Sequence, residues 1–111
     1  MQITYNDFEK VNIRSGTVMK AEPFLRALKP AFKVWVDFGP KLGVLQTSAQ
    51  VTIHYTPENL IGRQVLGVVN LGPKNIAGFE SQFLLLGCPD KQGAICLATL
   101  DPQVENGQKL F

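Results

Sequence analysis

The sequence predicts an all-β fold, a small five-stranded barrel with short helices and N- and C-terminal extensions. Two dense apolar runs, Val65–Leu71 and Phe83–Leu86, cannot remain in water and therefore belong to the middle of a sheet. In Phe32–Phe38 the side chains alternate between an apolar face and a face that carries Lys33 and Trp35, as in a half-buried strand. The ten Gly and seven Pro are spread at intervals that suit short strands and turns.

Length and composition indicate one domain, residues 1–111, with a barrel core of about 13–87 and extensions 1–12 and 88–111. The net charge of +2 is mild, so any contact with nucleic acid should be local and salt-sensitive. The first ten residues lack the apolar run of a signal peptide, and no segment approaches the ~20 apolar residues that span a bilayer. We therefore expect a cytoplasmic protein without membrane insertion.

The other strands are bounded by Gly and Pro. Asn12–Glu22 reads as the first strand, and Gly16 within it predicts a bulge or a tight bend. Phe24–Ala31 is expected to be a loop because prolines stand at both ends. Val44–Ser48 is the expected third strand, and Ala94–Leu100 is a further apolar strand after the barrel core.

Two short helices are predicted from their capping residues. In Tyr5–Val11, Asn6 as N-cap with Glu9 three residues on fits a capping box, and we expect this helix to cover one end of the barrel. Thr56–Gly62 combines an N-cap Thr, a Pro at the first helical position and a Gly past the helix end.

Five strands, a helix between the third and fourth, and long connectors after the first and fourth are the layout of an OB-fold. We interpret the second connector, Gly72–Gln82, as a polar loop with little apolar content. The ligand surface of that fold is the outside of strands two and three plus both connectors. Here it would gather the side chains of Arg26, Lys29, Lys33, Trp35, Lys74 and Ser81. Basic residues beside an aromatic ring suit a stacked base or a phosphate backbone.

Longer motifs add a family resemblance. Asn12–Val18, N-I-R-S-G-T-V, resembles the D-I-R-x-G-x-I opening of tRNA-binding OB domains, which are free-standing or appended to aminoacyl-tRNA synthetases. Asn70–Ser81, N-L-G-P-K-N-I-A-G-F-E-S, resembles their N-x-x-P-x-K-M-R-G-x-x-S loop. Within that group the chain is most similar to the CsaA-type, export-related chaperones. The shared runs are D-F-E-K, P-A-F-K, V-D-F-G, Q-T-S-A-Q, I-A-G-F and V-E-N-G.

The resemblance implies a homodimer in which the terminal extensions help to form the interface. It also implies binding of unfolded export substrates, and of tRNA among the fold relatives. The residues that match the family motifs are Arg14, Gln46, Ser48, Asn70, Lys74, Gly78 and Ser81. Ala77 stands where the tRNA-binding domains carry Arg, and Asn75 where a second basic residue is common. Each missing cation weakens phosphate contact.

For several of these side chains, a structural role is an alternative to ligand binding. Trp35 is either a platform for a base or peptide, or it is covered by the N-terminal helix or a partner subunit. The surface lysines are either solvated charges or part of a binding cluster. Arg14 is expected to pair with a carboxylate such as Asp37. Asn70 is expected to fix the backbone of the second connector, with ligand contact second.

No pattern indicates catalysis, a metal or a cofactor. His54 is the only histidine, and with no cysteine nearby we expect it to be structural. Cys88 and Cys96 allow one disulfide but, lacking a partnering His, make a poor metal site, so we expect reduced thiols. Ser48 and Ser81 lack the G-x-S-x-G context of a nucleophile.

We therefore predict a binding protein rather than an enzyme. The first hypothesis is a cytoplasmic homodimeric chaperone for unfolded or export-destined polypeptides, and the alternative is a tRNA-binding protein. Trp35, Phe24, Leu25 and Leu28 have no evident core role, and exposed together they would invite association. The predicted ligand-binding residues are Arg14, Lys33, Trp35, Gln46, Ser48, Asn70, Lys74 and Ser81.

Overall fold

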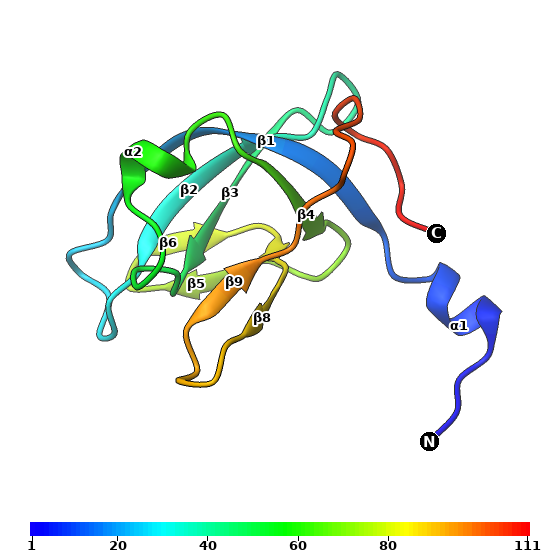
Figure 1. The fold of residues 1–111 in the computed structure, drawn as a ribbon, viewed down its shortest axis with the longest axis horizontal. Helices are drawn as coiled ribbons and strands as arrows, with labels where there is room; N and C mark the ends of the chain where they lie inside the picture. Colours follow the sequence, from blue (N-terminus) through cyan, green and yellow to red (C-terminus); the bar gives the residue numbers. More distant parts are fainter.

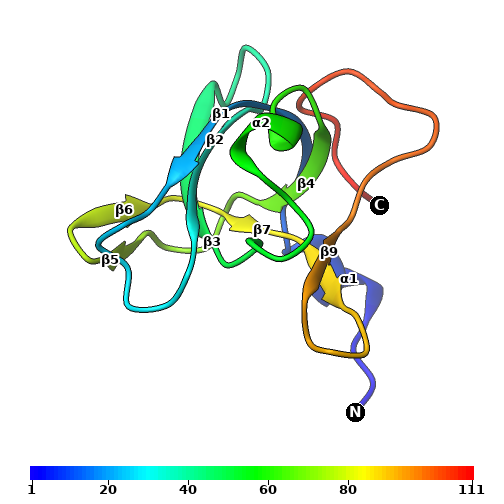
Figure 2. The ribbon, with the colours of Figure 1, turned by 60° about the vertical axis from the view of Figure 1, so that its left-hand side comes forward.

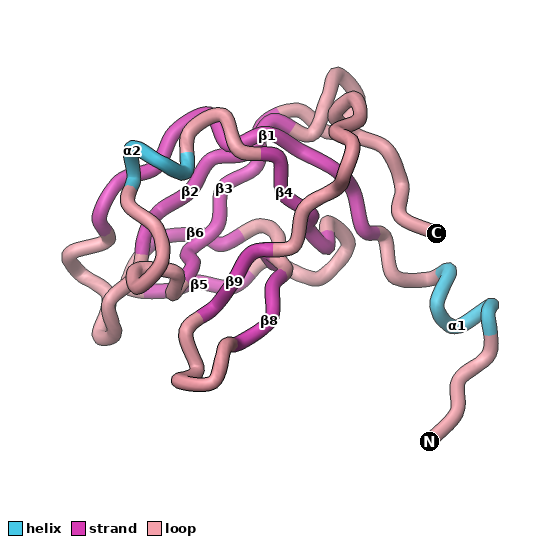
Figure 3. Tube along the Cα trace, viewed as in Figure 1, coloured by secondary structure: helices cyan, strands magenta, loops and turns pink.

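A computed structural model, which describes residues 1–111, shows a five-stranded antiparallel sheet curled into a nearly closed barrel of the OB-fold type (Figure 1). The strands, in the spatial order β3-β2-β1-β4-β7, are Val44–Ala49, Phe32–Asp37, Ile13–Pro23, Gln64–Val68 and Leu84–Leu85. Two hairpins stand outside this sheet, formed by β5 (Lys74–Ile76) with β6 (Phe79–Ser81), and by β8 (Gly87–Pro89) with β9 (Ile95–Leu97). Helix is confined to α1 (Tyr5–Glu9) and α2 (Pro57–Leu60) (Figure 3). The all-β prediction is confirmed, and none of the helices is long and apolar enough to cross a membrane.

Strand β1 is the longest strand and pairs with both β2 and β4. Its bulge lies between Val18 and Lys20, where the register shifts, and not at the predicted position Gly16. Gly16 is needed for close packing instead: a Cβ there would lie 2.5 Å from Val36 Cγ1 and 2.9 Å from Phe38 Cδ1. Glycine at this position therefore lets Val36 and the ring of Phe38 pack directly on the β1 backbone.

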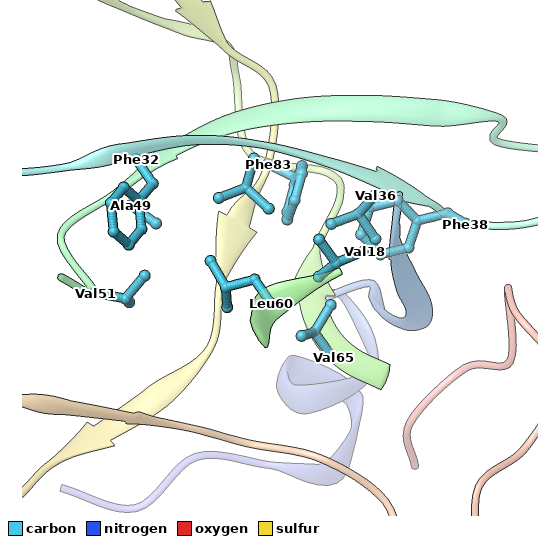
Figure 4. Packing of buried hydrophobic residues seen from close by; sticks show 10 residues of the cluster. Val18, Phe32, Val36, Phe38, Ala49, Val51, Leu60, Val65 and Phe83 are labelled. Carbon is cyan, nitrogen blue, oxygen red and sulfur yellow. The ribbon is translucent and has the colours of Figure 1, made fainter. Parts of the chain in front are cut away.

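The interior of the barrel is filled by side chains from strands β1 to β4, from α2 and from the adjoining loops (Figure 4). Phe38 and Phe83 meet edge to face with their ring centroids 4.9 Å apart. Gly67 makes room for both rings, because a Cβ there would lie 2.8 Å from Phe83 Cδ2 and 2.9 Å from Phe38 Cζ. The buried cluster consists of Val18, Phe32, Val34, Val36, Phe38, Ala49, Val51, Leu60, Val65 and Phe83. The alternation predicted for the second strand is confirmed by its burial pattern.

Helix α2 has the predicted caps. The hydroxyl of Thr56 accepts a hydrogen bond from Asn59 N at 3.1 Å, and Asn59 Oδ1 accepts one from Thr56 N at 3.0 Å. Gly62 follows the helix end at a φ of +86°. These caps hold Leu60, which is fully buried, against the interior of the barrel (Figure 4).

Helix α1 differs from its prediction in two ways. Its N-cap is Thr4 and not Asn6, and the capping box is completed by Asp7, with both hydrogen bonds at 3.1 Å. The helix has no buried residue and stands away from the barrel (Figure 1), so it does not cover the barrel end. The Thr4 hydroxyl reaches the amide three residues on, which fixes the start of the helix ahead of Asn6.

The C-terminal segment runs back along the barrel and is fastened by buried polar side chains of β1 and β4. Ser15 Oγ donates to Glu105 O at 2.8 Å and accepts from Gln108 N at 3.0 Å. Gln64 Nε2 donates to Val104 O at 2.7 Å, and Gln64 Oε1 accepts from Val104 N at 3.1 Å. A buried polar group without a partner is costly, so these side chains commit the segment to this position.

The last predicted strand is shorter than expected and lies outside the barrel sheet. Ala94–Leu100 was expected to be one apolar strand, whereas β9 covers Ile95–Leu97 and pairs with β8 alone. Ile95 and Leu97 of this hairpin still pack against the barrel core.

The close packing at Gly67 gives a test of the fold. Gly67→Ala is expected to lower the free energy of unfolding by about 1–3 kcal/mol, because the new methyl group overpacks two rings that cannot move apart. The measurement is urea-induced unfolding followed by circular dichroism. Gly72→Ala is the matched control, since nothing lies within 4 Å of its Cβ position. Equal stability of both variants would contradict the packing described here.

Candidate ligand-binding surface

The connector between β4 and β7 is a hairpin and not the predicted loop. Strands β5 and β6 pair from Lys74–Ser81 to Ile76–Phe79, and Ala77 and Gly78 form the turn. Both turn residues have positive φ, 50° and 84°, which fits the two-residue type I′ turn of a tight hairpin. Gly78 adopts this conformation at no steric cost, and Ala77 adopts it as well. Figure 2 shows the hairpin projecting from the barrel beside the loop that follows β1.

The register of this hairpin places Phe79 against the barrel wall. Its ring lies edge-on to Trp35 of β2 at 5.9 Å and to Phe24 at 5.5 Å, measured between centroids. We call Phe24, Trp35 and Phe79 the aromatic shelf. Phe24 is buried beneath this contact, so the expectation that it is free of a packing role is wrong.

Two lysines lie on the aromatic shelf. Lys20 Nζ is 4.6 Å from the centroid of Trp35, and Lys33 Nζ is 5.0 Å from Phe24 and 5.1 Å from Phe79. The attraction between an ammonium group and a ring face is worth about 0.5–1 kcal/mol at exposed sites. The shelf is therefore both aromatic and basic, as expected for Lys33 and Trp35.

Gln46 on β3 holds the indole and the hairpin together. Trp35 Nε1–H donates to Gln46 Oε1 at 3.2 Å, and Gln46 Nε2 donates to Glu80 O at 2.9 Å. The backbone amide of Gln46 donates to Gln82 Oε1 at 3.0 Å. Because the amide side chain is bonded on both sides, the orientation of the indole is fixed before any ligand arrives.

Hydroxyl groups fasten the base of the hairpin to β3. The buried Thr47 hydroxyl donates to Phe83 O at 2.7 Å, and its oxygen lies 2.9 Å from Ser81 Oγ. The Thr47 proton is used on the carbonyl, so the Ser81 hydroxyl is the donor of the second bond. Ser81 Oγ also accepts from Ser48 N at 3.3 Å. Ser48 and Ser81 thus lie beside the shelf and hold it in place.

Further cations surround the hairpin. Lys74 is exposed and pairs in register with Ser81, so it shares the face of the hairpin that meets β3. The Arg26 guanidinium lies 4.0 Å from the Cβ position of Gly78, at the hairpin tip. The structure therefore brings together the predicted residues Lys33, Trp35, Gln46, Ser48, Lys74 and Ser81.

Arg14 lies apart from this surface and has a different partner from the one predicted. Its Nε donates to Asn12 Oδ1 at 2.7 Å and its Nη1 to Gly107 O at 2.9 Å. The Asp37 carboxylate accepts instead from Gly39 N at 2.9 Å. The C-terminal segment supplies a carbonyl where the sequence suggested a carboxylate.

Asn70 also lies apart from the shelf. Its Oδ1 accepts from Asn12 N at 2.9 Å, and its Nδ2 donates to Lys10 O at 2.7 Å. The side chain fixes backbone as expected, but it is the backbone between α1 and β1 and not that of the β4–β7 connector. Arg14 and Asn70 therefore position the terminal extensions.

Two members of the surface, Lys20 and Phe79, were absent from the sequence prediction. Lys20 faces Trp35 because the bulge shifts the register of β1 by one residue; without it Met19 would take this place. Phe79 lies in the segment predicted to be a loop, and the direction of a side chain cannot be predicted in a loop. The sequence signal for a hairpin turn is the dipeptide Ala77–Gly78. This signal is weak because alanine rarely adopts the positive φ that the turn requires.

His54 has close neighbours that the sequence did not suggest. Its Nε2 lies 2.6 Å from Asp90 Oδ2, and Cys96 Sγ lies within 4.8 Å of one ring nitrogen of His54 and one carboxylate oxygen of Asp90, so the expectation of no nearby cysteine is wrong. The hydrogen bond from His54, followed by that from Ala94 N, holds the pKa of Asp90 below its usual value. Cys88 and Cys96 are free and exposed.

The barrel and its aromatic, basic outer face define an OB-fold domain with the groups of a binding surface. The chain belongs to the putative tRNA binding domain family, whose model matches residues 13–109. A crystal structure of the chaperone CsaA from Bacillus anthracis str. Ames is 41% identical and superimposes with a TM-score of 0.93, covering 100% of both chains. The CsaA chaperone protein from Picrophilus torridus is also 41% identical with a TM-score of 0.93, covering 99% of this chain and 100% of that one.

Enzymes are similar to the chain only in part of their length. A methionine–tRNA ligase from Chlorobium chlorochromatii is 35% identical over 108 residues, which are 97% of this chain and 15% of the ligase. The chain thus spans about 15% of the length of the curated relatives it matches.

The packing of the shelf predicts a fluorescence change. Phe79→Ala is expected to shift the emission of Trp35 to longer wavelength, because water replaces the ring that lies on the indole edge. Trp35 is the only tryptophan, so the emission reports this site alone. Phe111→Ala, at a residue that is 93% exposed, is the control and should leave the emission unchanged. An unshifted spectrum in the Phe79 variant would show that the two rings do not touch in solution.

Proposed function

We propose that the protein is a cytoplasmic homodimeric chaperone that binds unfolded or export-destined polypeptides on the aromatic shelf. The observation that carries this proposal is the continuation of the shelf into exposed apolar side chains. Leu25 and Leu28 of the loop after β1 are 91% and 103% exposed, and this loop lies beside the hairpin (Figure 2). Exposed leucines next to partly covered rings form the kind of patch that marks an interaction site.

The chemistry of this patch suits an extended chain of variable sequence. Aromatic and aliphatic groups gain free energy from burying apolar side chains of any shape, at roughly 25 cal/mol per Å². Lys20 and Lys33 lie over the rings, so their ammonium groups can meet backbone carbonyls or acidic side chains of the bound segment. The proposed activity is binding alone, without a cofactor or a chemical step.

The similarity to the CsaA structures supports this proposal, because it extends over the whole chain at 41% identity. Ala77 contributes no cation to the hairpin tip, where the Arg26 guanidinium of the neighbouring loop lies instead. We further propose a single domain, with the barrel core flanked by extensions 1–12 and 88–111.

A second apolar area supports the homodimer. Ile13, Leu66 and Val68 form a small buried cluster on the other side of β1 and β4 from the barrel interior. The C-terminal segment covers this cluster incompletely and leaves a hollow lined by Leu66, Leu100, Val104, Leu110 and Phe111, among others. A partner subunit that seats on this hollow would bury Phe111, which is 93% exposed in the single chain.

The chaperone proposal predicts a loss of affinity on truncating the shelf. Trp35→Ala should weaken binding of a carboxymethylated, permanently unfolded polypeptide by about tenfold or more, because buried aromatic anchors dominate such interfaces. Fluorescence anisotropy measures the affinity, and light scattering should give a molar mass of two chains for both proteins.

The control is Ile61→Ala, which removes an exposed apolar side chain beside Thr99 and Asp101. It should bind as the parent protein does. Unchanged affinity in the Trp35 variant, with the dimer intact, would contradict the proposal.

Binding of tRNA is the alternative function, and the cations around the rings favour it. Lys20, Lys33, Lys74 and Arg26 surround a surface on which bases can stack. The family model and the ligase relatives point to the same ligand.

If tRNA binds here, Lys74→Glu should weaken binding and lower the slope of log affinity against log salt by about one, since one phosphate contact is lost. Filter binding across a salt series measures both. Lys91→Glu makes the same change of charge at the tip of the β8–β9 hairpin and serves as the control. Equal losses in both variants, or no salt dependence, would count against this surface as the tRNA site.

A further inference from the structure

The β8–β9 hairpin brings three metal-ligating side chains together on the barrel. His54 lies in the turn after β3, Asp90 directly follows β8, and Cys96 lies in β9. One ligand atom of each side chain lies within 4.8 Å of the other two. We propose that these side chains bind a divalent transition metal, and that Zn²⁺ is the ion they suit.

The hairpin register accounts for the convergence. Cys88 pairs with Cys96, and Asp90 N donates to Ala94 O at 2.8 Å, so the register continues to the hairpin turn. Paired residues and residues two apart share one face of a hairpin, which puts Asp90 on the face that carries Cys96. Ile95 and Leu97 take the other face and pack on the core. The ligands are thus presented to solvent, where His54 meets them.

The backbone around the ligands is fixed by contacts that need no metal. Asp90 Oδ1 accepts from Gln92 N at 2.9 Å and from Ala94 N at 3.0 Å, so Oδ2, which faces His54 Nε2, is the oxygen available to the metal. Leu97 N donates to Tyr55 Oη at 2.8 Å and so ties β9 to the residue after His54. Carboxylates that ligate a metal directly are commonly held by hydrogen bonds of this kind.

The donor set selects the ion. Imidazole, thiolate and carboxylate are all zinc ligands, while Mg²⁺ and Ca²⁺ prefer oxygen alone. With ligand distances of about 2.0–2.3 Å, tetrahedral corners lie roughly 3.3–3.8 Å apart. The His54 and Asp90 atoms, which share a hydrogen bond at 2.6 Å, must give up that bond and separate to admit the ion. The His54 and Cys96 side chains are exposed and can rotate, while Asp90 keeps its backbone hydrogen bonds through Oδ1, and water takes the fourth position.

The bound ion would clip the β8–β9 hairpin to the turn before α2. A ligand that binds only the folded chain stabilises it in proportion to the logarithm of its concentration over its dissociation constant. The hairpin, which has no strand partner in the barrel sheet, would gain most from this connection.

The test uses the reduced, untagged full chain with Co²⁺ as a probe and Zn²⁺ as competitor. Co²⁺ should give a thiolate-to-cobalt charge-transfer band and the visible bands of a tetrahedral site, and Zn²⁺ should abolish both. Cys96→Ser should remove the charge-transfer band. His54→Gln should weaken Zn²⁺ binding by roughly tenfold or more, because it removes a direct ligand and even the loss of an outer-shell partner costs about tenfold.

Cys88→Ser is the matched control, because Cys88 is also exposed and lies opposite Cys96 in register. It should retain the band and bind Zn²⁺ within about threefold of the parent. Absence of the band in the parent protein would overturn the proposal. Equal losses in both cysteine variants with none in His54→Gln would assign the ion to the cysteine pair and overturn it as well.

Discussion

The contact of Phe38 with two glycine backbones is the constraint on which the rest of this structure depends. Gly16 and Gly67 leave the space that the Phe38 ring fills, and Phe83 closes against its edge. A barrel this small has an interior only wide enough for side chains, so two facing rings are possible only where other positions lack a Cβ. This packing fixes the end of the β5–β6 hairpin, because Thr47 donates to the carbonyl of Phe83.

The arrangement of the aromatic shelf depends on this interior packing. The Thr47–Ser81 hydroxyl pair holds the hairpin on β3, and Gln46 then orients the indole of Trp35 beneath Phe79. Rings positioned by a rigid sheet lose little conformational entropy when a ligand binds. Such a shelf, with ammonium groups on its rings, has what an extended polypeptide needs and what a stacked base needs. The chain is similar both to a structure named as a chaperone and to part of a methionine–tRNA ligase.

The sequence predicted those features that neighbouring residues determine. The caps of α2 around Thr56 and the outward placement of Trp35 follow from local spacing, and both are confirmed. Features that depend on distant partners were not predictable. No local sequence pattern predicts the bulge that turns Lys20 toward Trp35. The direction of the Phe79 side chain is set by the pairing of β5 with β6, which the sequence did not predict. Arg14 took a carbonyl from the far end of the chain in place of a carboxylate.

The central claim is that ligand binds on the aromatic shelf, and the indole N–H resonance of Trp35 tests it most directly. As the chain has one tryptophan, this resonance is unambiguous in a ¹H–¹⁵N correlation spectrum. Titration with a permanently unfolded polypeptide, and separately with tRNA, should shift it saturably together with the amides of Phe79 and Ser48. Saturable shifts confined to other parts of the barrel, with the Trp35 indole unchanged, would contradict the account.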